Sequence, residues 1–196
     1  MNSIITIGRE YGSGGREIGM KIAEQFGCPI FDKEIIIEAA KRNSINRELF
    51  ESFDEKALSS SLYIMVARAS NDPVTQPLAL RIQKAYAETI LELANTPCVI
   101  IGRSADYLLR DCDNLISFFI TADYKNRIER IAERYQVPLE KAEKMIFKQD
   151  RTRANYYKSM TGNVWGTAKN YDFCLCSSYY GIDTTVEIIK QIVQHS

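Results

Sequence analysis

The sequence predicts an α/β protein with a parallel sheet that helices cover on both faces. Short apolar segments alternate along the chain with longer segments whose apolar residues recur at helical spacing. The strand candidates are apolar throughout rather than alternating, which is typical of strands buried on both faces. At 196 residues the chain is long enough for one hydrophobic core, so we expect a single domain over residues 1–196.

The first half of the chain begins with a strand at residues 3–7, which ends at Gly8. A helix follows and stops at Gly27, a second short strand at residues 30–31 ends at Asp32, and another helix is expected near residues 35–40. Polar helical fragments interrupted by prolines fill residues 43–77, which we interpret as an insertion on the acceptor side of the site.

The second half continues the alternation of helices and strands. Helical spacing predicts helices over residues 78–93, around 128–135, from 139 to 146 and around 186–193. Strands are predicted at residues 98–101, 115–120 and 173–176. Ligands of parallel sheets bind beyond the carboxyl ends of the strands, so residues that directly follow strands are the site candidates.

Composition excludes several classes of function. Lys plus Arg and Asp plus Glu number 25 each, so no bulk field favours nucleic acid or an anionic membrane as a partner. No apolar stretch approaches the roughly 20 residues that span a bilayer. Five scattered cysteines and the absence of a leader-like start indicate reduced thiols in a cytoplasmic protein.

Metal–thiolate and histidine chemistry are not favoured. Cys174 and Cys176 would point to opposite faces of a strand, and the sequence has no second Cys/His pair to complete four ligands. The single histidine, His195, lies next to the end of the chain. Any chemistry here must therefore proceed without histidine.

The segment from Gly8 to Glu17 joins the first strand to the first helix and contains three further glycines. Glycines let backbone N–H groups turn toward phosphate oxygens, and the helix N-terminus adds about half a positive charge. We therefore predict that Gly12, Ser13, Gly14 and Gly15 bind the phosphates of a nucleotide. A purely structural turn is the alternative.

Neither standard nucleotide-binding pattern is complete. Gly-x-Gly-x-x-Gly fails at Glu17, and Gly-x4-Gly-Lys-Ser/Thr fails because Arg16 and Glu17 follow Gly15. Arg16 could supply the missing charge, and Glu17 could reach Mg²⁺. The alternative is a solvated Arg–Glu pair.

Two groups of arginines could also meet phosphates. One group lies at helical offsets of three and seven and comprises Arg127, Arg130 and Arg134, although such a set is more often a solvated face. The other follows a basic helix and contains Arg151 and Arg153, which could close over a polyphosphate.

At the level of whole segments the chain resembles the cytidylate kinase-like family. The resemblance rests on ungapped stretches in order: residues 5–19, 31–34, 98–103, 105–110, 150–151 and 171–172. It covers nearly the whole chain. It implies a three-layer P-loop NTPase-like fold, a helical lid at about residues 137–165, and Mg²⁺-dependent transfer of the ATP γ-phosphoryl group to an acceptor phosphate.

The resemblance also implies roles for particular residues. Gly12 to Arg16 and Arg127 would hold the donor nucleotide, while Asp32, Arg103 and Asp106 would face the acceptor. Arg16, Arg151 and Arg153 would be catalytic, with Glu17 near the metal. The expected substrates are ATP and a small phosphorylated acceptor such as CMP or dCMP. Because the P-loop lysine and hydroxyl are replaced, a nucleotide-binding regulatory protein without turnover stays open, as does a kinase of another metabolite.

Overall fold

The protein is a three-layer α/β structure around one parallel sheet, as the sequence predicts. The computed structural model describes residues 2–32 and 78–196. Its five strands pair in parallel in the order β2-β3-β1-β4-β5. They are β1 (Ile4–Arg9), β2 (Ile30–Phe31), β3 (Cys98–Ile101), β4 (Leu115–Thr121) and β5 (Phe173–Cys176).

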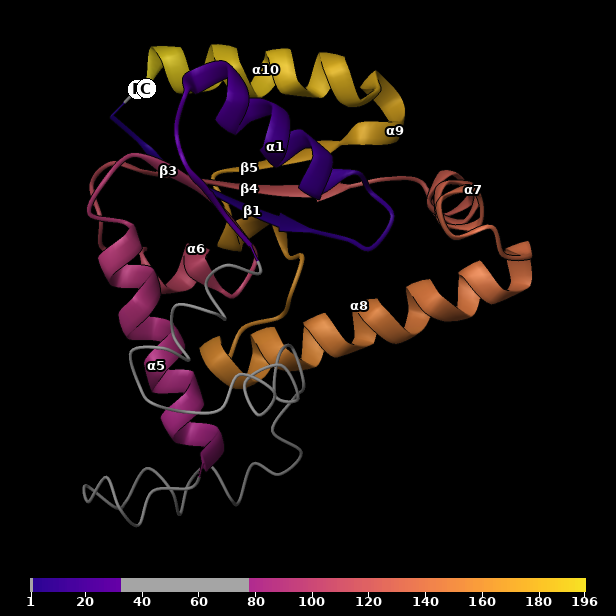
Figure 1. The fold of residues 1–196 in the computed structure, drawn as a ribbon, viewed down its shortest axis with the longest axis horizontal. Coiled ribbons are helices and arrows are strands. Elements are labelled where there is room, and N and C mark those ends of the chain that lie inside the picture. Colours follow the sequence, from indigo (N-terminus) through magenta and orange to yellow (C-terminus); the bar gives the residue numbers. More distant parts are fainter. Residues whose placement is uncertain (1, 33–77) are drawn as a thin grey trace.

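Helices cover both faces of this sheet (Figure 1). On one face, α1 (Gly15–Phe26) and α10 (Ile182–His195) pack together and bury residues such as Ile18, Ile22 and Ile189 against the strands. On the other face, α5 (Leu78–Leu93) and α6 (Ala105–Leu108) form a second core with β1 and β3. The apolar strands are thus buried on both sides, which explains their lack of polar alternation.

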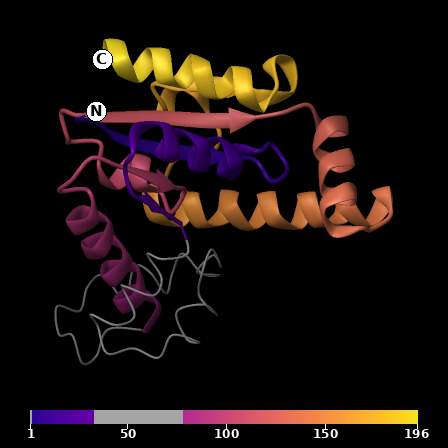
Figure 2. The ribbon, with the colours of Figure 1, turned by 45° about the horizontal axis from the view of Figure 1, so that its top comes forward.

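The remaining helices lie beyond the sheet's carboxyl edge or beside it. They are α7 (Tyr124–Tyr135), α8 (Leu139–Thr161), the short 3-10 helix η1 (Ala168–Asn170) and α9 (Ser177–Tyr180). Helix α7 lies at one end of the sheet and α8 runs back from it beneath the sheet (Figure 2); these two helices, called the arm below, share a small core of Ile131, Ala142 and Ile146. The predicted lid at residues 137–165 corresponds to α8 and the segment that follows it.

Two boundaries differ from the sequence prediction in ways that affect the site. Strand β1 continues past Ile7 to Arg9, because Arg9 still pairs with Ile120 of β4. Helix α8 does not end near residue 146 but runs to Thr161, so Arg151 and Arg153 lie within a helix. The expected helix near residues 35–40 and the insertion at 43–77 lie outside the described residues.

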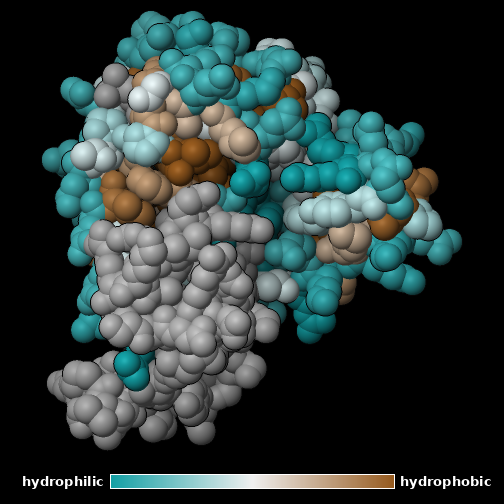
Figure 3. Space-filling model, viewed as in Figure 1, coloured by the Kyte–Doolittle hydropathy of each residue, from teal (hydrophilic) through white to brown (hydrophobic). Residues whose placement is uncertain are grey.

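The face in Figure 3 is mostly hydrophilic over α10, while the surface over α7 and α8 is hydrophilic with apolar patches. No helix in residues 2–32 and 78–196 is long and apolar enough to cross a membrane. His195 lies at the end of α10 with its ring on a backbone carbonyl of the same helix, away from the strand ends.

Candidate phosphate-transfer site

The glycine-rich loop presents its backbone N–H groups as a set of unused donors. Gly12 and Gly14 have positive φ values of 86° and 79°, which side chains rarely adopt, and α1 begins directly after Gly14. Within the described part of the chain, the N–H groups of Gly12, Gly14, Arg16 and Glu17 have no protein acceptor. Such a group of amides at a helix N-terminus is an anion-binding arrangement.

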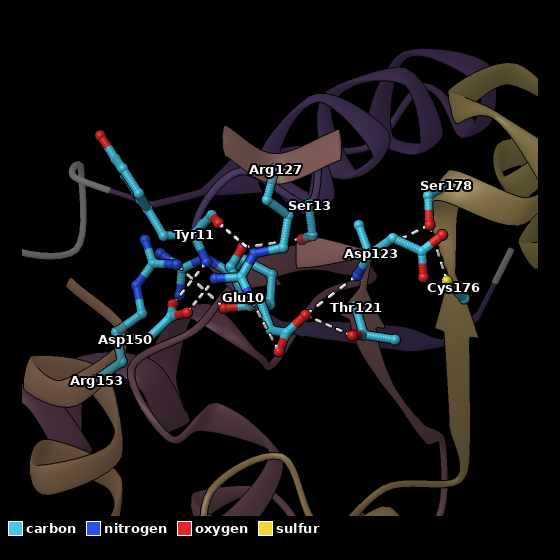
Figure 4. Close-up of polar contacts among 12 residues, drawn as sticks. Glu10, Tyr11, Ser13, Thr121, Asp123, Arg127, Asp150, Arg153, Cys176 and Ser178 are labelled. Atoms are coloured by element: carbon cyan, nitrogen blue, oxygen red, sulfur yellow. Dashed lines mark hydrogen bonds and ion pairs between the residues drawn. The ribbon is translucent and has the colours of Figure 1, made fainter. Parts of the chain in front are cut away.

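The loop is held from outside by the buried Arg127 of α7 (Figure 4). Its Nε donates to the carbonyl oxygen of Tyr11 at 2.8 Å, and its two terminal nitrogens meet the carboxylates of Glu10, at 3.2 Å, and Asp150. Asp150, from α8, accepts in turn from the N–H of Tyr11 at 2.8 Å. We predicted Arg127 as a nucleotide ligand, but its guanidinium is occupied by these protein groups, and it fixes the loop to both helices of the arm.

Other contacts complete the support of the loop. Glu10 accepts hydrogen bonds from Thr121 Oγ1 and from the N–H of Ala122 at the end of β4. The buried Ser13 hydroxyl donates to the carbonyl oxygen of Glu10 at 2.9 Å, and the Ser13 carbonyl accepts from Ser177 of α9 at 2.5 Å. The Ser13 side chain is therefore structural, and the backbone of the loop is its phosphate-facing part.

Arg16 points away from the loop. Its Nε donates to Asp32 at 2.8 Å, which joins the start of α1 to the end of β2. Arg130 of α7 lies beside the loop: its Nη1 is 2.5 Å from the position of an ideal Cβ on Gly14 and 3.9 Å from the Glu17 carboxylate. Helical spacing groups Arg130 with Arg127, but in the structure Arg127 binds Glu10, Tyr11 and Asp150, whereas Arg130 lies near Gly14 and Glu17.

Beside the loop, a small polar pocket lies at the carboxyl ends of β1 and β3. Three arginines are among its lining residues: Arg9, Arg103 and Arg153. Its other lining residues are Gly8, Gly102, Ser104, Asp106, Tyr156, Tyr157, Trp165 and Tyr171. Its volume is about 20 Å³, which is room for about one water molecule. Three permanent positive charges around one small pocket favour an anion there.

Asp106, predicted on the acceptor side, lies in the wall of this pocket. It accepts a hydrogen bond of 2.7 Å from the Tyr157 hydroxyl. Burial raises the pKa of Asp106 to about 6, although the bond from Tyr157 opposes the shift. The pKa of Tyr157 is raised by burial and by the neighbouring Asp106. Asp106 thus changes charge near neutral pH.

The two predicted lid arginines lie on different sides of α8, because residues two apart on a helix are separated by about 200°. Arg153 reaches the strand end, where its Nη1 donates to the carbonyl oxygen of Arg9 at 3.1 Å and its guanidinium lies 5.5 Å from the Tyr11 ring centre. Arg151 is exposed. The structure therefore joins Arg103, Asp106 and Arg153 in one pocket, with Asp32 and Arg16 paired beyond it.

The side chains at the loop do not fit a magnesium site built by the protein. Neither Arg16 nor Glu17, one of which stands at the hydroxyl position in either register of the P-loop pattern, carries a hydroxyl, and the Glu17 carboxylate lies 3.9 Å from Arg130 Nη1. The described residues contain no group of three metal-ligating side chains. A magnesium ion held mainly by phosphate oxygens and water would depend little on this chain.

Arg9 was missing from the residues predicted for the site. The sequence prediction placed Arg9 in the loop after the strand and gave it no role. A different register of the P-loop pattern could have identified it: with Gly14 as the last glycine, Arg9, Gly14 and Gly15 stand where the pattern has glycine, glycine and lysine.

A parallel sheet in this order, with a glycine-rich loop opening α1 and an arginine pocket beside it, defines a protein of the P-loop kinase class. A family model described as the cytidylate kinase-like family matches residues 4–179. The chain belongs to that family.

Relatives and solved structures agree with this assignment. Cytidylate kinases of Pyrococcus horikoshii and Methanopyrus kandleri are 22% and 24% identical to the chain, which they match over 98% and 97% of its length and 88% and 92% of their own. An uncharacterized protein from Eubacterium ventriosum, known from its crystal structure, is 31% identical with a TM-score of 0.77 and full coverage of both chains. Shikimate kinase from Bacteroides thetaiotaomicron shares the fold at 10% identity, with a TM-score of 0.54 and 99% of both chains covered.

Proposed function

We propose that the protein transfers the γ-phosphoryl group of ATP to a small acceptor that already carries a phosphate, with CMP or dCMP as first candidates. The supporting observation is that Arg9 links the two parts of the site: its stem packs on Gly15 of the loop with the open amides, and it lines the pocket with Arg103 and Arg153. One set of donors suits the phosphates of ATP, and the neighbouring cations suit the phosphate of the acceptor. The cytidylate kinase relatives support a nucleotide as that acceptor.

The proposed reaction needs no general base. An acceptor phosphate oxygen attacks the γ-phosphorus, a P–O bond forms, and the bond from that phosphorus to the β–γ bridging oxygen breaks. ADP leaves with the bridging oxygen, and no proton has to move. Catalysis then consists of alignment and neutralisation of charge, which arginines and backbone amides supply.

In this proposal Arg103 binds the acceptor phosphate and Asp32 faces the rest of the acceptor. Arg153, which extends from α8 into the pocket, supplies positive charge to the ATP phosphates and to the acceptor phosphate. Arg151 is exposed in this structure, and its side chain would reach the phosphates only if α8 moves. Since the pocket of about 20 Å³ cannot hold a nucleotide, we infer that α8 moves outward for acceptor entry and returns for transfer.

A nucleotide-binding regulatory protein without turnover is the second candidate. The observation that favours it is the pairing of Arg16 with Asp32, which removes the side chain next to Gly15 from the phosphate loop. Binding would then survive through the backbone amides, while transfer would be lost.

An ADP-release assay separates these candidates. Purified protein is given ATP and Mg²⁺ with CMP, dCMP, UMP, AMP or phosphorylated sugars, and each rate is compared with a reaction without acceptor. We expect acceptor-dependent ADP release that is largest for a cytidine monophosphate. ATP binding in calorimetry without any acceptor-dependent release would establish the regulatory reading instead.

If only a phosphorylated sugar stimulates ADP release, the protein is a phosphotransferase as proposed, but its acceptor is a sugar phosphate rather than a nucleotide. The control variant is Arg110→Ala, whose side chain stacks on Tyr107 outside the pocket and which should behave as wild type.

A further inference from the structure

Arg9 and Gly15 contact each other across the phosphate loop. An ideal Cβ on Gly15 would lie 2.5 Å from the Arg9 Cβ and 3.1 Å from its Cγ. A side chain at position 15 would therefore project into the space that the Arg9 stem occupies. In the present backbone, only one of these two positions can carry a long side chain.

The P-loop pattern places glycine and a cation at these same two positions, in the opposite order. With Gly14 as the last glycine of Gly-x4-Gly-Lys, the first glycine falls on position 9 and the lysine on position 15. This chain has Arg9 and Gly15 there. Relative to the pattern, the cation and the small residue stand at opposite ends of the loop, and the steric contact between positions 9 and 15 means that a long side chain at one requires a small residue at the other.

The Arg9 side chain extends from the start of α1 to the end of β3. Arg9 is buried, its stem packs on Gly15 at the start of α1, and its guanidinium contacts Gly102 at the end of β3. Gly102 has a positive φ of 70°, and any Cβ there would collide with the Arg9 Nη1. The guanidinium then lines the pocket with Arg103 and Arg153. Arg9 thus extends from the donor loop to the acceptor pocket.

We propose that Arg9 supplies, from the end of β1, the positive charge that lysine supplies from α1 in other P-loop proteins. Gly15 and Gly102 are the small residues that give its side chain room. Arg9 then contacts the transferred phosphoryl group between donor and acceptor. Arg16, held by Asp32, does not take this part. The inference rests on the proposed phosphotransfer.

The test restores the standard pattern in steps. Arg9→Gly removes the cation, Gly15→Lys adds the second cation into occupied space, and the double variant Arg9→Gly/Gly15→Lys recreates Gly-x4-Gly-Lys. ATP and inorganic tripolyphosphate binding are measured by calorimetry, and turnover by ADP release. Thermal unfolding identifies any variant that has lost its fold, and Arg9→Met, which keeps the stem on Gly15, replaces Arg9→Gly if that variant is unfolded.

We expect Arg9→Gly, or Arg9→Met in its place, to lower kcat about 10- to 150-fold, the range for one charged hydrogen-bonding partner. Gly15→Lys alone should also lose activity, because its side chain meets Arg9. The double variant should exceed both single variants by about tenfold. The comparison with Arg9→Gly is the decisive one, because relief of the steric contact alone could raise the double variant only to the level of Arg9→Gly, and activity above that level requires the restored charge. Arg110→Ala, which removes an arginine outside the pocket, is the matched control and should stay within about threefold of wild type.

Wild type that turns over while neither Arg9 variant loses kcat or tripolyphosphate affinity would overturn the Arg9 assignment and leave the proposed function intact. A double variant no better than the single ones would also overturn it. Wild type that binds ATP without any turnover would refute the proposed transfer, and tripolyphosphate binding would then still decide whether Arg9 serves the phosphates. Wild type that binds neither ligand would refute both.

Discussion

At the scale of single residues, the site depends on where buried charges lie relative to the strand ends. Asp106 shares its pocket with three arginines and three tyrosines, and its hydrogen-bond partner is Tyr157. Because burial raises its pKa to about 6, the net charge of the pocket changes between pH 5 and 7.

This titration should govern anion binding. Above pH 6 Asp106 is a carboxylate that repels an anion, whereas below pH 6 it is neutral. We expect sulfate, which keeps its charge over this range, to bind about tenfold more weakly at pH 7.5 than at pH 5, a coupling of about one pK unit. Calorimetric titration measures it. Asp106→Asn should remove the pH dependence, and an unchanged slope in that variant would refute the assignment.

Gly14 gives a second prediction at this scale. Its φ of 79° and its contact with Ile182 and Arg130 leave no room for a branched side chain. Gly14→Val should lower ATP affinity more than tenfold in calorimetry, since the loop amides would be displaced. Gly27→Val is the matched control, because Gly27 also has a positive φ but open space around it. Equal losses of affinity in the two variants would place the nucleotide away from this loop.

At the scale of secondary-structure elements, α7 and α8 are attached to the phosphate loop through one buried ion-pair network. Arg127 binds Glu10, Tyr11 and Asp150, so a single side chain joins the arm to the end of β1. Burying this charge is tolerated because its nitrogens have hydrogen-bond partners. The position of α8, and with it of Arg153, therefore depends on Arg127.

Arg127→Met should lower the free energy of unfolding by about 3–5 kcal/mol, because two carboxylates lose their partner inside the protein. The double variant Arg127→Met/Asp150→Asn should regain part of this free energy of unfolding, because one of the two unpaired carboxylates is then neutral. Chemical denaturation measures both. Lys125→Met is the control on the same helix, where an exposed pair with Glu129 at 4.0 Å should contribute less than about 1 kcal/mol. A loss no larger than that of the control would show that the network does not hold the arm.

At the scale of the whole molecule, the arm and the sheet enclose a pocket that is too small for the proposed acceptor. Trp165, the single tryptophan of the chain, lies in its wall and packs edge-on against Phe119 of β4 at 5.4 Å between ring centres. Outward movement of α8 would change this contact.

We therefore expect acceptor binding to change the fluorescence of Trp165. ATP and the acceptor identified by the panel are added separately and together, and emission is followed. Arg103→Ala should lose the acceptor-dependent change while keeping that of ATP. No change with a bound acceptor would indicate that the acceptor lies outside this pocket.

Within residues 2–32 and 78–196, the sequence alone predicted the five strands and the longer helices, because apolar strands and amphipathic helices differ in their periodicity, but not the short helices α6, η1 and α9. It also located the glycine-rich turn between β1 and α1. Its limits appear in the side chains around that loop. Spacing along a helix grouped Arg127 with Arg130, and adjacency grouped Arg151 with Arg153.

Only the tertiary structure separated these pairs, because burial and partners depend on which element packs behind each face. Asp150 and Glu10 draw Arg127 inward, while Arg130 stays near Gly14. Continuation of β1 to Arg9 turned a loop arginine into part of a pocket with Arg103, some 90 residues away in the chain. The local sequence pattern cannot predict that Arg9 and Arg103 lie in one pocket, because their proximity depends on how β1 and β3 align in the sheet.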